Sequence, residues 1–511
     1  MDKKKEQAPA NGAKLELVAR ITLPDGRVVE KIVEAGGGIP SPEEFDTSDK
    51  DKFLATYDRF ERSVVDARDR LSKSIGETIS DELKKNDGPG GVVRLHKVEG
   101  ELAVVEFPFC GRLAASLKPK EHLMSISLTE IVTQLALHGS YRHASDIANK
   151  IYHRDGKDIF IPETVKARCI RMGNAASFSY MSEACEVLEN HGIDRETGII
   201  DDSSRIPDSA RKPDLPEPVS EQLIAETVKA VNEGRSERER IAHLEKVSAT
   251  EASANDCVYV MIDDVGVKHQ KEERNGDGQK GGQYVQNTVV HMQCGETQQT
   301  LTAIGMTNAF RLLVAFLLAN RLMENHRLIF LTDGARDIKE NIAAFFGFRD
   351  YTLILDWLHL KKKCKEYLSM AVKGCGKDRD ERREDKARII RALLRILWSG
   401  NVQEAADYLN TLYAKNVNNQ YWMKQLTDYI GRKQENIACY AFRHKLGLRV
   451  SSNRVEKAND LLVANRQKHN GMSWSEKGSG ALAVITALQV NNKLLSWLRG
   501  EKQLLTMNEA A

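Results

Sequence analysis

The feature that most constrains the fold of this chain is a short apolar run that ends in a carboxylate. Residues 328–331 are apolar, and Thr332, Asp333 and Gly334 follow them. Such a run, bounded by a turn residue, is typical of a strand buried on both faces of a sheet. Residues 258–263 and 351–356 are built the same way and also end in aspartate. With helices between them, these strands predict an α/β sheet with carboxylates at one edge, which suits divalent metals and phosphate groups.

The order of the patterns predicts the topology of this sheet. Three strand patterns, at 257–270, 282–294 and 298–305, come first. An apolar helix at 307–325, the Asp333 strand, a helix at 338–346 and the Asp356 strand follow. This order is that of an RNase H-like fold, in which an antiparallel meander precedes parallel strands joined by helices. Residues 358–448 then read as helices with apolar residues at four-residue steps, and the core resumes at Ser451.

A chain of 511 residues is too long for one hydrophobic core, so we expect several units. Four of its twelve prolines fall within residues 201–220, which we interpret as a stiff linker. The predicted organisation is an N-terminal α+β module of unknown role (1–115), a helix-turn-helix domain (116–200), the linker (201–220), the first part of the RNase H-like core (221–357), an all-helical insertion (358–450) and the final core helices (451–511).

The helix-turn-helix prediction rests on three short helical patterns between residues 123 and 173. Pro162 suits the first position of the third helix, which exposes Lys166, Arg168 and Arg171. A basic third helix is what enters the major groove of DNA in this motif. Three-helix units without DNA contacts are equally common, so the pattern alone leaves both readings open.

Charge and composition narrow the classes of function. The net charge is +2, but residues 357–511 carry 28 Lys and Arg against 15 Asp and Glu. A basic C-terminal third suits a protein that binds phosphate backbones, although a solvated helical face has the same composition. No apolar run of about eighteen residues and no apolar leader is present, and no two cysteines form a C-x-x-C pair. We therefore expect a cytoplasmic protein with no membrane span, no secretory signal and no zinc site.

The aspartates predict a metal site. Neighbouring strands lie about 4.8 Å apart, so Asp263 and Asp333 would face each other if the first and fourth strands are neighbours. Glu456, on the helix after the insertion, can supply a third carboxylate. Crowded carboxylates repel one another unless a divalent cation lies among them, and two Mg²⁺ ions about 4 Å apart suit phosphodiester cleavage. Each aspartate taken alone is as well explained as a turn cap. Asp264 points to the other side of its strand and is left out.

Asp356 and His359 form an Asp-x-x-His pair one strand further from Asp263. The pair is a less suitable shared metal ligand because it is roughly 10 Å away. It can hold water or DNA near the acids, or be a hydrogen-bonded pair in the core.

The order of these residues resembles that in Mutator-like DDE transposases of bacterial insertion sequences. The resemblance is carried by Asp263, Asp333-Gly-Ala, Asp356-Trp-Leu-His359, Asn453-Arg-Val-Glu456 and the trailing stretch at 464–475. It implies an RNase H-like catalytic domain after a helix-turn-helix, with a helical insertion before the last acid. It also implies Asp263, Asp333 and Glu456 as the catalytic, metal-binding triad, with Asp356 and His359 as a pair near it. From the strand spacing we expect this pair to act beside the metal ligands and not as ligands.

The resemblance further implies a cofactor and partners. The cofactor is Mg²⁺, as two ions for which Mn²⁺ can substitute. The partners are double-stranded DNA, at the transposon ends and the target, and further copies of the chain assembled on that DNA in the bacterial cytoplasm, at the nucleoid. Two departures stand out: Asp263-Asp264-Val265 replaces the Asp-Gly-Thr of many relatives, and only Phe109-Cys110-Gly111 remains of a cysteine pair that some carry.

The leading prediction is therefore a transposase that binds terminal inverted repeats, cuts the 3′ ends and joins them to target DNA. Candidate phosphate contacts are Lys361, Lys362, Lys363, Arg466 and Lys468, and the lysine run also suits a solvated helix end. Two alternatives are a structure-specific nuclease on the same fold and a domesticated transposase that only binds DNA. The insertion and the helix-turn-helix argue against the first, and the complete triad argues against the second.

Overall fold

The computed structural model of the chain describes residues 15–23, 25–34, 40, 44, 48, 50–87, 90–99, 101–110, 122–152, 160–270, 284–413, 417–468, 472–501 and 503–507. The predicted boundary at residue 115 and residues 469–471 of the trailing motif lie outside these ranges. Two compact units are present, residues 1–136 with 141–165 and residues 137–140 with 166–511. No helix in the described ranges combines the length and apolar character that a membrane crossing requires.

The first unit begins with a β-hairpin. Strands β1 (Glu16–Thr22) and β2 (Val28–Glu34) pair antiparallel, with Gly26 at a φ of 83° in the turn. Helix α1 (Lys50–Asp87) contacts both strands and β4. A second sheet holds β3 (Gly90–Glu99) between antiparallel β4 (Glu101–Cys110) and parallel β5 (His122–Met124). The region predicted as an α+β module is thus α+β.

Helices α3 (Ile126–His138), α4 (Tyr141–Tyr152) and α5 (Pro162–Asn190) follow. Two hydrogen bonds join the Asn149 side chain to the backbone of Phe160 and hold α4 against the start of α5. We predicted that the third helix is short, but it is 29 residues long. Gly173 lies within the helix, and a Cβ at this position would lie 2.3 Å from the Ala481 carbonyl oxygen. The glycine lets this part of α5, which belongs to the second unit, pack directly on a later helix of the same unit.

The segment predicted as a stiff linker, residues 201–220, is instead part of the second unit. It contains the short helix α6 (Asp208–Arg211). Arg327 donates a 2.8 Å hydrogen bond to the Pro216 carbonyl, Pro218 bridges to Glu251, and Val219 is buried. Helices α7 (Glu221–Asn232) and α8 (Glu245–Ser248) then lead into the sheet, with short 3-10 turns at Glu237–Glu239 and Ala254–Asp256.

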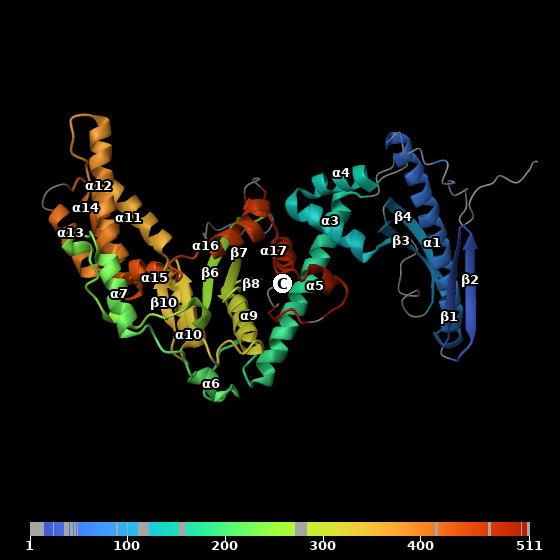
Figure 1. Cartoon of the computed structure of the whole chain (residues 1–511), viewed down its shortest axis with the longest axis horizontal. Coiled ribbons are helices and arrows are strands. Elements are labelled where there is room, and N and C mark those ends of the chain that lie inside the picture. The colour runs from blue at the N-terminus through green and yellow to red at the C-terminus, as the bar shows by residue number, and fades with distance from the viewer. Residues whose placement is uncertain are drawn as a thin grey trace, which may run out of the picture. The chain divides into compact units, whose positions relative to one another are not determined.

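The central sheet has the predicted topology (Figure 1). Its strands are β6 (Cys257–Lys268), β7 (Tyr284–Cys294), β8 (Thr297–Ile304), β9 (Arg327–Thr332) and β10 (Thr352–Leu355), in the spatial order β10-β9-β6-β7-β8. The first three form an antiparallel meander. Strand β9 is parallel to β6, and β10 is parallel to β9. This mixed α/β sheet is compatible with an RNase H-like fold.

Helices cover both faces of the sheet. On one face, Phe330 of β9 packs on Phe346 of α10 (Arg336–Phe346), which packs on Phe310 of α9 (Met306–Ala319). On the other face, Asn287 of β7 donates a 2.8 Å hydrogen bond to Ser479 of α17 (Glu476–Val490). Helix α16 (Asn453–Asn459) and the π-helix η7 (Asp460–Lys468) contact β6, and α18 (Leu494–Leu498) follows α17.

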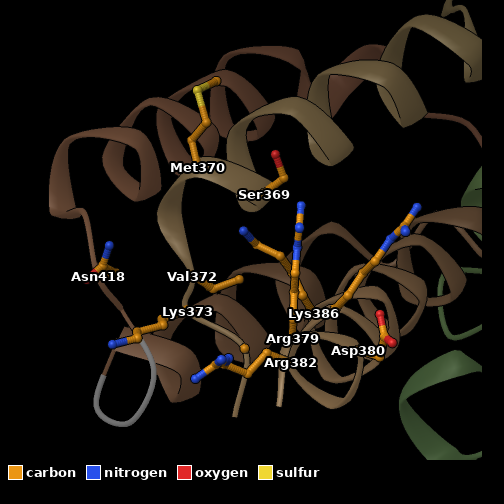
Figure 2. Close-up of a pocket in the computed structure, with 11 residues that line it drawn as sticks. Ser369, Met370, Val372, Lys373, Arg379, Asp380, Arg382, Lys386 and Asn418 are labelled. Atoms are coloured by element: carbon orange, nitrogen blue, oxygen red, sulfur yellow. The ribbon is translucent and has the colours of Figure 1, made fainter. Parts of the chain in front are cut away.

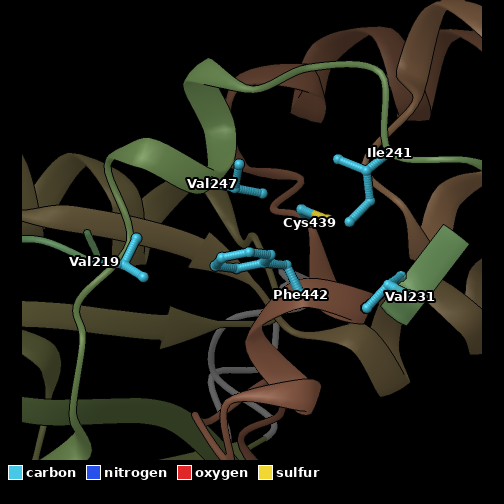
Figure 3. Packing of buried hydrophobic residues seen from close by; sticks show 7 residues of the cluster. Val219, Val231, Ile241, Val247, Cys439 and Phe442 are labelled. Atoms are coloured by element: carbon cyan, nitrogen blue, oxygen red, sulfur yellow. The ribbon is translucent and has the colours of Figure 1, made fainter. Parts of the chain in front are cut away.

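The predicted insertion is all-helical. It consists of α11 (Trp357–Ala371), α12 (Arg379–Trp398), α13 (Val402–Tyr413), α14 (Gln420–Lys433), a 3-10 turn (Gln434–Asn436) and α15 (Tyr440–Lys445). Helix α11 contacts α12 and α14, and Figure 2 shows the junction between α11 and α12. Figure 3 shows the core that joins the end of the insertion to α7 and α8, with Phe442 and Cys439 among Val219, Val231 and Val247.

Candidate active site

Asp263 on β6 and Asp333, the residue directly after β9, lie at matching positions along neighbouring parallel segments. Met261 of β6 pairs with Leu331 of β9, and each aspartate lies two residues further along its chain. Gly334 turns the chain after Asp333 with a φ of 82°, and a Cβ there would lie 2.8 Å from the Leu355 side chain. Only glycine fits this turn without strain. The predicted neighbouring first and fourth strands therefore bring both acids to one edge of the sheet.

Asp263 is half-buried and held from two sides. Its Oδ2 accepts a 2.6 Å hydrogen bond from the Asn459 amide, and its Oδ1 accepts from the Asp264 backbone N–H at 2.9 Å. Burial, and then the nearby charge of Asp333, raises the pKa of Asp263 to about 6. A second carboxylate nearby disfavours the ionised form of a carboxyl group, and a cation between the two would favour that form.

Asp264 is directed away from Asp263. It accepts a 2.5 Å hydrogen bond from Thr288 on β7, its partner in the strand pairing. Alternation along a strand places residues 263 and 264 on opposite faces. Asp264 is therefore a suitable comparison for the three acids of the candidate site, since it has the same chemistry at the adjacent position.

Glu456 approaches from the helix after the insertion. It lies on α16, one turn before Asn459, so the two side chains share a helix face. Its Oε1 lies 3.6 Å from His359 Nδ1, and its side chain is 44% exposed. Asn459 binds Asp263 while Glu456 contacts His359, so α16 spans from one carboxylate of the site to the histidine.

Asp356 is fully buried, and both of its oxygens are occupied. Oδ1 accepts a 2.7 Å hydrogen bond from the His359 backbone N–H and caps α11, while Oδ2 accepts from the Ser452 backbone N–H and, at 2.8 Å, from its hydroxyl. Burial works to raise the pKa of Asp356, but the hydrogen bonds from His359 and Ser452 outweigh it and hold the pKa below its ordinary value. Asp356 thus contacts His359 and Ser452 and is closed off from solvent.

His359 lies between three carboxylates. Its Nδ1 is 3.4 Å from Asp356 Oδ1. Asp356 raises the pKa of His359 against the opposing effect of burial, and the charges of Asp333 and Glu456 add to the increase. An imidazolium at this position partly compensates the negative charge at the edge of the sheet.

The side chains around Asp263 and Asp333 determine which metal ion could bind at this edge of the sheet. In the described part of the chain, no three His, Cys, Asp or Glu side chains form a group that could hold one. Asp263 binds Asn459, and Asp333 Oδ1 accepts a 2.7 Å hydrogen bond from the Ala335 backbone. Mg²⁺ takes one or two carboxylates and completes its shell with water and phosphate oxygens. The hard oxygens and raised pKa at Asp263, beside Asp333, fit an ion of this kind, with Glu456 nearby on α16.

Sequence reasoning missed the contact between the insertion and the candidate site. Lys433, at the end of α14, donates a hydrogen bond to the Gly334 carbonyl next to Asp333. Burial lowers the pKa of Lys433. The two residues are 99 positions apart, so no local pattern pairs them. No local pattern pairs Asn459 with Asp263 either. However, Asn459 lies one helical turn after Glu456, and this spacing could have indicated that it faces the same site.

The structure distributes the predicted DNA contacts unevenly. Lys166 and Arg171 are exposed on α5, and Arg168 is half-buried. Lys362 is exposed and Lys361 half-buried at the start of α11, where Lys363 pairs with Glu366 at 3.2 Å. Lys468 is exposed at the end of η7.

Arg466, also a predicted DNA contact, packs inside the fold in this structure, and its contact with DNA stays a prediction. It is only 6% exposed, its guanidinium lies 5.1 Å from the centre of the Trp474 ring, and it approaches the Met472 sulfur at 3.7 Å. A cation packed on an aromatic face inside the fold stabilises η7 and is not presented to a phosphate.

Comparison with known proteins adds little to this geometry. No family model matches the chain, and no curated protein matches it. Among solved structures, the Drosophila P element transposase strand transfer complex is similar at 10% sequence identity and a TM-score of 0.18, covering 65% of this chain and 82% of that chain. A similarity of this size carries no functional argument, so the proposal below rests on the residues themselves.

Proposed function

We propose that this protein is a metal-dependent DNA transposase. The observation that carries the proposal is the convergence of Asp263 and Asp333 at matching positions of parallel strands, with Glu456 on the helix that also binds Asp263. This arrangement supports phosphodiester chemistry because carboxylates at one sheet edge can hold divalent ions against a phosphate.

In this proposal Asp263, Asp333 and Glu456 hold Mg²⁺, as two ions, and Mn²⁺ substitutes for it. The ions that these three residues would hold would supply stabilisation of the negative charge that develops on the attacking and leaving oxygens of the phosphodiester. The proposed reactions are 3′-end cleavage by water and joining of the freed 3′-OH to target DNA. The chain's own residues position this site. Asp356 anchors His359 and Ser452, Asn459 orients Asp263, and Lys433 holds the carbonyl next to Asp333.

The substrate in this proposal is the pair of terminal inverted repeats of a bacterial insertion sequence. The motif order from Asp263 to Glu456, which resembles that of Mutator-like transposases, supports the assignment. The exposed Lys166 and Arg171 on α5 support recognition of the repeats by this helix. Assembly of several copies on the two ends is part of the same proposal.

The experiment that tests the function uses the full chain, a duplex carrying the ends of its own element, and Mg²⁺. Every nick is mapped at nucleotide resolution, with a target plasmid present to capture joined products. We expect Mg²⁺-dependent nicks at the 3′ ends, followed by joining. Cuts that depend on branched structure and ignore the ends would indicate a structure-specific nuclease. End binding without any cut would indicate a protein that only binds DNA.

A further inference from the structure

A basic pocket lies in the insertion, between the end of α11 and the start of α12 (Figure 2). Its volume is about 1130 Å³. Five cationic side chains line it together with one acid, Asp380: Lys373, Arg379, Arg382, Arg383 and Lys386. None of the five forms an ion pair within the ranges that the structure describes. The candidate active site does not use this pocket.

The acidic side chains near the pocket bind the backbone of the loop and helix that form it. Asp378 caps α12, Glu381 accepts a 2.7 Å hydrogen bond from the Lys377 backbone, and Asp385 accepts a 2.9 Å hydrogen bond from the Cys375 backbone. Asp385 also pairs with Arg388. The negative charges therefore hold the loop between α11 and α12, while the cations of the same segment are left facing the pocket.

Two glycines bring the loop onto α12. A Cβ at Gly374 would lie 1.9 Å from the Arg382 carbonyl oxygen. Gly376 has a φ of 152°, and a Cβ there would lie 2.6 Å from the Glu381 side chain. Any larger residue would push the loop away from the helix. This close packing brings Lys373 to the same pocket as Arg382, so the cluster is a consequence of the fold rather than of composition alone.

The lining of the pocket favours a phosphate backbone over a nucleotide. None of the described lining residues is aromatic, and the apolar ones are Met370 and Val372. A base held in a pocket is usually stacked on an aromatic side chain. An open pocket with several cations and no stacking surface suits phosphates that belong to a larger molecule.

Helix α11 links the pocket to the candidate active site within one unit. Asp356 caps its first turn, and Ser369 and Met370 line the pocket near its last residue, Ala371. A helix of fifteen residues is about 22 Å long at 1.5 Å per residue. At 3.4 Å per base pair, this corresponds to roughly six base pairs of a duplex.

We propose that the pocket binds the phosphate backbone of duplex DNA on a segment flanking the phosphate at the acidic edge. This inference rests on the proposed function, because it takes the DNA at that edge as given. The arginines neutralise backbone phosphates without reading sequence, so the pocket adds affinity for element ends and for unrelated duplexes alike.

The test compares the full-length protein with an Arg379→Ala/Arg382→Ala variant and a charge-matched control, Lys424→Ala/Lys445→Ala. The control residues are exposed in the same insertion but do not line the pocket. Binding of a labelled duplex is measured by anisotropy at a series of salt concentrations, and melting curves verify that all three proteins are folded. We expect the slope of log affinity against log salt to become less steep by about 2 in the pocket variant. The control should keep the wild-type slope.

Each other outcome has a distinct meaning. A pocket variant with the wild-type slope would overturn this inference, while cleavage of element ends would still support the proposed function. A wild-type protein that binds no duplex at any salt concentration would overturn both. Calorimetry with inorganic phosphate alone tests whether the pocket binds a free phosphate anion instead of the phosphates of DNA. Saturable binding that is lost in the pocket variant, together with an unchanged DNA slope, would assign the pocket to a free anion and overturn the proposal.

Discussion

At the scale of single residues, Asp356 connects more of the candidate site than any acid predicted as a ligand. It caps α11, which carries His359, and binds Ser452, which precedes α16 and Glu456. Its complete burial excludes direct contact with a substrate in this conformation. Its effect on chemistry must therefore pass through the orientation of His359 and α16.

Replacing Asp356 with Asn keeps its shape and removes its charge. Because Asp356 holds His359 and Ser452 in place beside the proposed ligands, we expect cleavage to slow by roughly 10–100-fold while the Mg²⁺ concentration for half-maximal activity changes little. The measurement is a metal titration of nicking beside a melting curve. A sharp rise in the Mg²⁺ requirement would make Asp356 a ligand. Normal activity per folded molecule with a lower melting temperature would leave it a core residue only.

His291 makes the stability of the sheet depend on pH. It is buried on β7, its Nδ1 lies 2.9 Å from the Thr300 hydroxyl, and burial lowers its pKa from 6.5 to about 4. Between these two values the unfolded chain binds a proton that the folded chain does not, so stability falls as the pH drops from 6.5 to 4. The full loss is about 3 kcal/mol.

The comparison is between the wild type and His291→Gln, by denaturant unfolding at several pH values. We expect the variant to show the smaller loss of stability between pH 6.5 and 4. Parallel pH curves for the two proteins would show that His291 titrates normally in the folded state.

At the scale of elements, strand order was predictable and helix contacts were not. Apolar runs identify β6, β9 and β10. The strands and helices predicted between them restrict the order in which these strands can lie in the sheet. Gly173 of α5 packs closely on Ala481 of α17, and these residues are far apart in sequence. The burial of Arg466 depends on Trp474 folding back over η7. Local pattern therefore predicted that the strands leading to Asp263 and Asp333 are neighbours. It did not predict the contacts that Asn459 and Lys433 make around these acids.

Helix α5 is the element we expect to read the terminal repeat. Replacing the exposed Lys166 and Arg171 with Ala should weaken binding to specific ends, with a smaller effect on an unrelated duplex. Gel shifts with both duplexes measure this, and Lys212→Ala/Lys229→Ala is a control of equal charge at exposed positions outside the helix. Equal effects of the two double variants would remove α5 from the specific interface.

At the scale of the whole second unit, a buried ion pair connects the last helix of the insertion to the residues just before the sheet. Arg443 of α15 donates to both oxygens of Glu251, one of them at 2.8 Å, and Tyr259 of β6 donates to the same carboxylate at 2.9 Å. Arg443 and Glu251 are 192 residues apart and almost fully buried. The pair thus joins the end of the insertion to the segment that leads into the central sheet.

Removing one partner of this pair should destabilise the protein strongly. Arg443→Met leaves Glu251 buried without its cation, which costs about 3–5 kcal/mol. Adding Glu251→Leu should recover most of the loss, because the unpaired charge is removed as well. Urea unfolding of the three proteins measures both effects. A single variant as stable as the wild type would show that the pair does not hold the insertion in place.

The most direct test of the account is single-turnover nicking of an element end by Asp263→Asn, Asp333→Asn and Glu456→Gln in Mg²⁺. Asp264→Asn is the matched control, and gel shifts verify end binding. Loss of several kcal/mol of transition-state stabilisation predicts cleavage slower by about a thousandfold or more in each of the three, with end binding retained and the control close to the wild-type rate. Wild-type cleavage by any one of the three would exclude that residue from the metal site and contradict the account.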